Sequence, residues 1–305
     1  MKNIIKDYVS LTKPGIIFGN LIAAASGFFL AAKGNIDWFV FFIVILGTAL
    51  IVASGCVVNN YVDRDIDLKM NRTKNRALAQ GRINTLPALL FALILGALGF
   101  ALLYLYTTFY AVLFGAIGIL VYVGLYTLKF KRNSVYGTLV GSLSGACPPV
   151  MGYVAITNSF DMGAAILLLL FCFWQIPHSY AIAICRFEDY KAAKIPVLPV
   201  KYGIEAARFH MYVYIVGFAI SSLLLYTQGY AGIVYAVVIV LMNGYWIYLV
   251  KTGSKAENEQ AWGRKMFVLS IIIITVLSIL ISVDYVRDEQ TDTLSPGVNE
   301  LSMPL

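Results

Sequence analysis

Residues 41–67 have the sequence FFIVILGTALIVASGCVVNNYVDRDID, in which a long apolar run ends abruptly in asparagines and aspartates. An α-helix rises 1.5 Å per residue, so about 20 apolar residues cross the roughly 30 Å of hydrocarbon in a bilayer. The apolar run that we assign to 38–59 carries no charged residue. The sequence therefore predicts a transmembrane helix with polar side chains where it reaches one membrane surface.

Similar apolar runs recur along the whole chain of 305 residues. Hydrophobic residues make up 60% of the chain and charged residues only 13%, with a mean hydropathy of +0.78, which excludes an ordinary soluble protein. We predict an all-α integral membrane protein in which 1–285 form a single domain and the polar tail 286–305 is disordered outside. The predicted spans, about nine in number, lie near 15–33, 38–59, 86–107, 110–129, 135–157, 162–184, 210–229, 231–250 and 266–285.

The basic residues predict the orientation of these spans. All lysines and arginines except Lys33 and Arg287 lie on one side if the N-terminus is cytoplasmic, as expected for cytoplasmic loops. We therefore expect a cytoplasmic N-terminus and a C-terminus outside. The net charge of +7 reflects this topology and an anionic substrate, and it does not argue for nucleic acid. Residues 1–13 resemble neither a signal peptide nor a transit peptide, so we expect a bacterial inner membrane.

Three polar side chains follow the second span at helical spacing. Asn60, Asp63 and Asp67 would lie on one face if the helix continues. Neighbouring carboxylates repel each other unless a cation lies between them, and oxygen ligands favour Mg²⁺, which bridges to phosphates. The alternative is a solvated helix end whose carboxylates pair with nearby basic residues. The basic segment RTKNR at 72–76 favours a site for a metal and a diphosphate.

A second charged segment follows the sixth span. CRFEDYK at 185–191 matches DRDIDLK at 63–69 in its arginine, its aspartate and its lysine, with Asp189 aligned to Asp67. We interpret this match as a weak internal repeat, in which two helix ends face each other across a shared cavity.

Several motifs together resemble the intramembrane aromatic prenyltransferases, and within them the haem O synthase branch. The resemblance covers the chain except its tail and implies nine helices around a central cavity. That superfamily has aspartates where Asn60 and Cys185 stand, and the branch shares both changes, which weakens a second metal centre. Within the branch a proline is commoner at the position of Ala77 and a glycine at that of Lys194. These two differences affect the expected loop conformation. The motifs are NNYVDRDID at 59–67, KMNRTKNR at 69–76, WQIPHSY at 174–180 and DYKAAKIPVLP at 189–199.

The resemblance implies transfer of a farnesyl group from farnesyl diphosphate to a vinyl group of protohaem IX, with Mg²⁺ as cofactor. Asp63, Asp67 and Asp189 are the expected catalytic residues, and with Asn60 they are the expected metal ligands. The expected partners are farnesyl diphosphate, protohaem IX and the lipid bilayer, with a haem A synthase or a terminal oxidase as candidate protein partner. The candidates for diphosphate contact are Arg72, Arg76, Lys131 and Lys191.

His178 is one of two histidines and lies about 12 Å inward from the membrane surface if its helix ends at Arg186. It is a candidate ligand of the haem iron. The alternative is a neutral, hydrogen-bonded histidine beside Pro177, and the sequence leaves both open. Electron-rich walls would protect a farnesyl cation from water. Candidate wall residues, each also explained as packing or interfacial, are Tyr61, Tyr122, Tyr126, Tyr153, Trp174 and Tyr180.

Two other functions fit parts of the sequence. A prenyltransferase for a quinone precursor such as 4-hydroxybenzoate would have the same helices, but His178 and Cys185 argue against it. A secondary transporter could use the repeated helix ends as an anion site. The short outer loops, with almost no charge, do not favour a transport gate.

Overall fold

The computed structural model describes residues 2–253 and 256–286, so the predicted tail beyond Val286 lies outside the described residues. Within these ranges nine helices are long and apolar enough to cross a membrane, as predicted. The seventh and ninth begin earlier than predicted, because both helices continue through charged residues at which the apolar runs end. The spans are α2 (Pro14–Ala32), α3 (Trp38–Val62), α5 (Thr85–Tyr106), α6 with η1 and α7 (Phe109–Asn133), α8 (Gly137–Thr157), α9 (Met162–Cys185), α12 (Ile204–Thr227), α13 (Ile233–Thr252) and α14 (Glu259–Val283).

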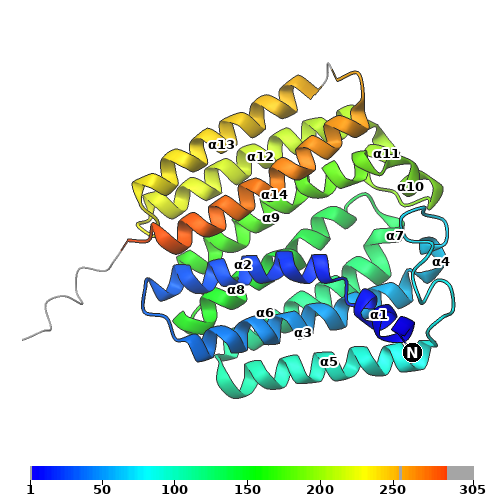
Figure 1. Cartoon of the computed structure of the whole chain (residues 1–305). Helices are drawn as coiled ribbons and strands as arrows, with labels where there is room; N and C mark the ends of the chain where they lie inside the picture. The colour runs from blue at the N-terminus through cyan, green and yellow to red at the C-terminus, as the bar shows by residue number, and fades with distance from the viewer. Residues whose placement is uncertain (1, 254–255, 287–305) are drawn as a thin grey trace, which may run out of the picture.

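The short helices gather at one end of the bundle (Figure 1). This end also carries the two charged segments that follow α3 and α9. Segments far apart in the sequence are therefore brought to one surface. The short helices are α1 (Lys2–Leu11), α4 (Arg64–Asp67), α7 (Lys131–Asn133), α10 (Phe187–Ala192) and α11 (Leu198–Tyr202).

Glycines set the close approach of α2 to α8. A Cβ on Gly27 would lie 1.9 Å from the carbonyl oxygen of Pro149, and one on Gly152 would lie 1.9 Å from that of Ala24. Helices in lipid associate through close packing of small residues rather than through a hydrophobic driving force. The two backbones therefore touch, and α2 is fixed beside the centre of the bundle.

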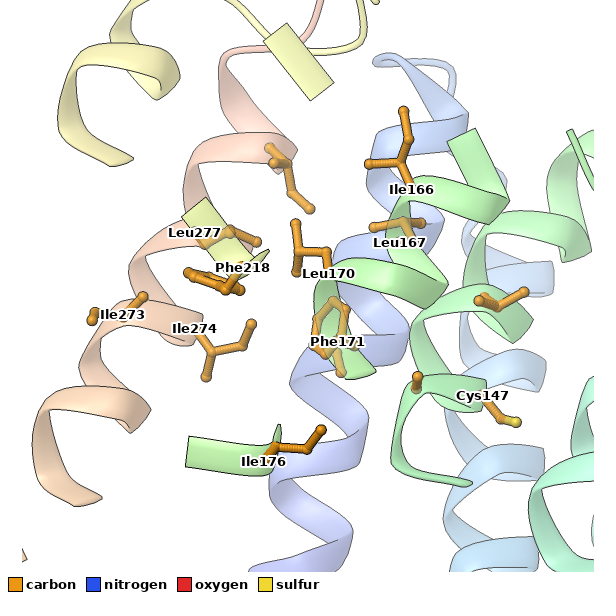
Figure 2. Packing of buried hydrophobic residues seen from close by; sticks show 14 of the residues in the cluster. Cys147, Ile166, Leu167, Leu170, Phe171, Ile176, Phe218, Ile273, Ile274 and Leu277 are labelled. Atoms are coloured by element: carbon orange, nitrogen blue, oxygen red, sulfur yellow. The ribbon is translucent and has the colours of Figure 1, made fainter. Parts of the chain in front are cut away.

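The core is continuous from α9 to its neighbours. Leu170 and Phe171 of α9 are buried with Ile274 and Leu277 of α14 and Phe218 of α12 (Figure 2). This packing holds α9 against α14 along several turns, so side chains of both helices form one wall of the space described below.

The sequence did not identify α1 as a helix. Its Leu11 is buried against Val57 of α3 and against Ala77, while Arg82 donates hydrogen bonds of 3.0 and 2.8 Å to the carboxylate of Asp7. These contacts hold the segment 70–84 against the bundle, and that segment carries part of the candidate site.

Candidate active site

A cavity of about 1260 Å³ lies inside the charged end of the bundle. Its wall is formed by parts of α2, α3, α4, η1, α7, α8, α9, α10 and α14, together with the segments 70–76, 134–135 and 195–197. Among the described residues, α5, α12 and α13 contribute nothing to this wall. The expected central cavity is therefore present, with these three spans outside its lining.

Basic side chains dominate the charged lining of this cavity. Asp67 is the one carboxylate among the described lining residues. Such a surface attracts anions. The basic lining residues are Lys13, Arg72, Arg76, Lys131, Arg186 and Arg264.

Asp67 lies at the end of a bent helix. α3 ends at Val62 and α4 begins at Arg64, and the N–H of Asp67 donates to the carbonyl of Asp63 at 2.8 Å, so one more helical turn follows α3. The carboxylate of Asp67 is 3% exposed and accepts from Nη1 of Arg76 at 2.9 and 2.8 Å. The two hydrogen bonds offset part of the cost of burying the polar oxygens of this side chain.

Asp63 is buried beside the cavity and is held by basic side chains. Lys131 donates to its Oδ2, and Nη2 of Arg132 lies 3.7 Å from its Oδ1. Arg132 donates instead to Asp65, whose pKa it lowers to about 2 through hydrogen bonding. Among the described residues, Asp63 Oδ1 is therefore buried with no hydrogen-bond partner.

The ends of the second and sixth spans converge, as the repeat predicts. Asp189 is buried, and its Oδ1 accepts from the backbone N–H of Asn71 at 2.8 Å. Met70 also packs in one apolar cluster with Ala193 and Ile195. Asp189 itself does not line the cavity, but it holds the segment that carries Arg72 and Arg76.

The asparagine that lines the cavity is Asn59, not the predicted Asn60. Nδ2 of Asn60 donates to the carbonyls of Leu11 and Cys56 at 2.8 and 3.0 Å, so it anchors α1 to α3. Asn59 accepts from Lys13 through Oδ1 and donates to Thr127 at 3.1 Å.

Lys13 is a lining residue that sequence reasoning counted only as a topology signal. It lies just before α2 with φ at 53°. Burial lowers the pKa of Lys13 to about 8, and the nearby Arg76 and Lys131 act in the same direction. A cation that is costly to bury and lies beside other cations is suited to bind an anion.

Three of the candidate wall aromatics line the cavity. Tyr122 and Tyr126 belong to η1 (Leu120–Phe130), a π-helix, and their rings stack at 5.9 Å, while Trp174 comes from α9. Such π-helical segments are frequent at functional sites. Phe171, Tyr190 and Phe267 also line the cavity, and the sequence gave no sign of them.

The other candidates lie elsewhere. Tyr61 packs under Arg64, Tyr153 bonds to Asp161, and Tyr180 packs against His210. Lys191, a candidate for diphosphate contact, is exposed and is not part of the lining.

His178 lines the cavity and contacts α14 through one ring nitrogen. Its Nδ1 lies 2.8 Å from the hydroxyl oxygen of Ser270, and that hydroxyl donates its single proton to the carbonyl of Phe267 at 2.6 Å. Both contacts are satisfied together when Nδ1 carries the ring proton and donates it to Ser270. This leaves the Nε2 lone pair available, so a hydrogen-bonded neutral histidine and an iron ligand are compatible here.

The two loop positions noted in the sequence differ in strain. Lys194 has φ at 55°, a left-handed conformation that explains why glycine is commoner there. Ala77 is fully buried beneath α1. Cys185 lines the cavity, at the position where the resemblance implies a carboxylate in the superfamily.

The oxygen donors at the end of α3 suit Mg²⁺ chemically. The described residues contain no group of three or more His, Cys, Asp or Glu side chains arranged to hold a metal. Asp63 Oδ1 is nevertheless buried and unbonded, and Asp67 faces the cavity. Two carboxylates of this kind fit a hard cation that takes its remaining ligands from water and substrate phosphates.

Comparison with known proteins agrees with this architecture. The model of the UbiA prenyltransferase family matches residues 20–272, so the chain belongs to that family. Protoheme IX farnesyltransferase 2 of Pseudomonas fluorescens is 57% identical to the chain over 281 residues, which are 92% of this chain and 95% of the relative. Protoheme IX farnesyltransferase of Cronobacter sakazakii is 53% identical over 95% of this chain and 99% of its own length. The resemblance found in the motifs is thus confirmed.

Solved structures share the fold. A structure concerned with digeranylgeranylglyceryl phosphate synthase has a TM-score of 0.75 and 23% identity, covering 93% of this chain and 99% of that one. A UbiA homolog from Archaeoglobus fulgidus, bound to GPP and Mg²⁺, has a TM-score of 0.69 and 18% identity over 91% of this chain and all of that one.

Proposed function

We propose that the chain transfers a farnesyl group from farnesyl diphosphate to a vinyl group of protohaem IX, giving haem O. The relatives that share more than half of its residues over nearly their whole length are named for this reaction. One observation carries the proposal within the structure. A single cavity has basic side chains at the end of α3 and, on α9, a histidine with an available Nε2.

The donor site uses an exchange of partners. Asp63 and Asp67 would hold Mg²⁺, and bound Mg²⁺ would supply positive charge that stabilises diphosphate as a leaving group. Lys131 and Arg76, which now neutralise these two carboxylates, would then bond to phosphate oxygens. Each of these four charged side chains would then have a partner both before and after Mg²⁺ and diphosphate bind. This avoids the cost of an unpaired buried ion.

The remaining basic residues and Asp189 complete the donor site. Lys13 and Arg72 line the same part of the cavity and would contact diphosphate directly. Asp189 would act through the segment that it holds by accepting from Asn71. Asn60 would act through α1, and the exposed Lys191 has no role in this arrangement.

In the reaction, the allylic carbon–oxygen bond breaks and its electron pair leaves with diphosphate. The vinyl π electrons of the acceptor attack the farnesyl carbon, water adds to the resulting cation, and a proton is released. Basic side chains stabilise the charge that develops on diphosphate. The rings of Tyr122, Tyr126 and Trp174 stabilise the carbocation and limit the access of water.

The acceptor would approach from the side of α9. His178 would ligate the haem iron through Nε2, with Nδ1 held by Ser270. The charged end of the bundle would face the cytoplasm in a bacterial inner membrane, because cytoplasmic loops carry an excess of lysine and arginine. A haem A synthase or a terminal oxidase, either of which would use the product, is the candidate protein partner.

Competition between acceptors tests this function. The purified chain, with labelled farnesyl diphosphate and Mg²⁺, should farnesylate protohaem IX and not 4-hydroxybenzoate, with the products identified by mass. Chelation of Mg²⁺ should stop the reaction. Prenylation of 4-hydroxybenzoate alone would contradict the proposal, and turnover unaffected by chelation would contradict the metal assignment.

A further inference from the structure

A second group of basic side chains lies on the wall formed by α9 and α14. Arg186 directly follows the last residue of α9, and Arg264 lies in the second turn of α14. A Cβ on Gly263 would lie 3.0 Å from the backbone nitrogen of Cys185, so the two helices nearly touch between the arginines. Arg186 and Arg264 are the residues that follow Cys185 and Gly263 at this close contact, and both line the cavity.

These two arginines differ from the basic side chains of the donor site. Of the donor-site cations, Lys13, Arg76 and Lys131 each bond to an Asn or Asp side chain, while Arg72 lies in the segment that Asp189 holds. The guanidinium groups of Arg186 and Arg264, both on exposed residues, have no hydrogen-bond or ion-pair partner among the residues that the structure describes. Two nearby acidic side chains have other partners, since Asp189 accepts from the N–H of Asn71 and Glu259 pairs with Arg208 at 3.1 Å.

The arginines share a wall with the candidate haem ligand. Arg264, Phe267 and Ile271 follow one another at i, i+3 and i+7 on α14, and all three line the cavity. The ring of Phe267 lies 5.1 Å from that of His178. Arg186 lies eight residues beyond His178, about 12 Å along the axis of α9. The wall thus has an aromatic and imidazole surface inside and two guanidinium groups toward its mouth.

We propose that Arg186 and Arg264 bind the two propionate carboxylates of the porphyrin acceptor, so that the macrocycle lies against His178. Guanidinium groups bind carboxylates through paired, charge-assisted hydrogen bonds. In the proposed function diphosphate is bound by Lys13, just before α2, by Lys131 of α7 and by the segment 70–76, so the two anionic substrates use separate groups of cations. This inference rests on the proposed function and adds the recognition of the acceptor to it.

The test compares protohaem IX with its dimethyl ester, in which both propionates are uncharged. The first measurement uses the unaltered chain and requires that it convert protohaem IX to haem O. The ester should then show a KM about tenfold or more above that of the free acid, as expected for lost hydrogen bonds between charged groups. Equal KM values for acid and ester in the unaltered chain would overturn the inference, and they would leave the proposed function intact.

Variants then assign the effect to the arginines. Arg186→Gln and Arg264→Gln should each raise the KM for protohaem IX about tenfold, leave that for farnesyl diphosphate unchanged and reduce the preference for acid over ester. Lys265→Gln, at the exposed neighbour of Arg264 outside the cavity, should match the unaltered chain. A rise in the KM for farnesyl diphosphate instead, or an undiminished acid preference in both arginine variants, would contradict the assignment.

Discussion

Asp67 is a nearly buried carboxylate whose charge is balanced by Arg76. Replacing it with asparagine keeps its shape but removes the charge that would hold Mg²⁺. We predict that Asp67→Asn lowers kcat for haem O formation by about 10²–10³-fold, comparable to the removal of a strong electrostatic contact in other active sites. The measurement is turnover of the purified variant with saturating Mg²⁺ and both substrates.

Asp65→Asn is the matched control for this prediction. Asp65 is exposed, pairs with Arg132 and does not line the cavity. Its replacement should leave turnover within about twofold of the unaltered chain, because exposed ion pairs contribute little. Full activity in Asp67→Asn would contradict the metal assignment.

Lys13 gives the site a dependence on pH. Its pKa, lowered to about 8 mainly by burial, means that the free protein loses this positive charge as the pH rises through 8. We predict that the KM for farnesyl diphosphate rises above pH 8, while below that pH Lys13 is protonated and the KM is constant. In Lys13→Arg the charge persists, so this rise should be absent. An identical pH profile in the variant would show that Lys13 does not contact diphosphate.

The sequence predicted the site only where local geometry decides it. Asp63, Asp67 and the basic segment after them follow from helical spacing, and His178 follows from its depth in a span. Asn59 and Asn60 lie about 40° and 60° from Asp63 around a helix, so spacing alone cannot choose between them. The tertiary structure distinguishes them, because the carbonyl of Leu11 in α1 accepts a hydrogen bond from Nδ2 of Asn60. Lys13 was not identified because its partner, Asn59, is distant in sequence.

The helices themselves were predictable because each has an apolar run long enough to span a bilayer. The closest contacts between helices were not predictable. Many glycines in the chain have open space around them, so a glycine in the sequence does not by itself mark a contact. Gly27 and Gly152 are distinguished only by the backbone of the facing helix. The π-helical η1 and the amphipathic α1 were not predictable either. Neither of them changes the apolar pattern by which a span is recognised in a sequence.

The contact between α2 and α8 gives a prediction about stability. Gly152→Val should destabilise the protein by about 2 kcal/mol or more, because even a Cβ would lie 1.9 Å from the carbonyl oxygen of Ala24. Thermal unfolding in detergent measures this change. Gly244→Ala is the control, since a Cβ there meets nothing within 4 Å. An unchanged Tm in Gly152→Val would show that this contact does not constrain the bundle.

For the whole molecule, the charged loops at one end predict the orientation in the membrane. Single cysteines can be placed at Ser159, between α8 and α9, and at Lys201, in α11, in a chain whose four native cysteines are replaced. A membrane-impermeant maleimide should label position 159 in spheroplasts and position 201 only after the membrane is opened. The reverse pattern would contradict a cytoplasmic active site.

The whole account depends on the convergence of the α3 and α9 ends over one cavity that holds both substrates. The most direct measurement is haem extraction and mass analysis from cells that lack haem O and express either the unaltered chain or Asp67→Asn. We predict haem O in the first case and only protohaem in the second, with both proteins present in the membrane at similar levels. The absence of haem O in the first case, or equal haem O in both, would contradict the account.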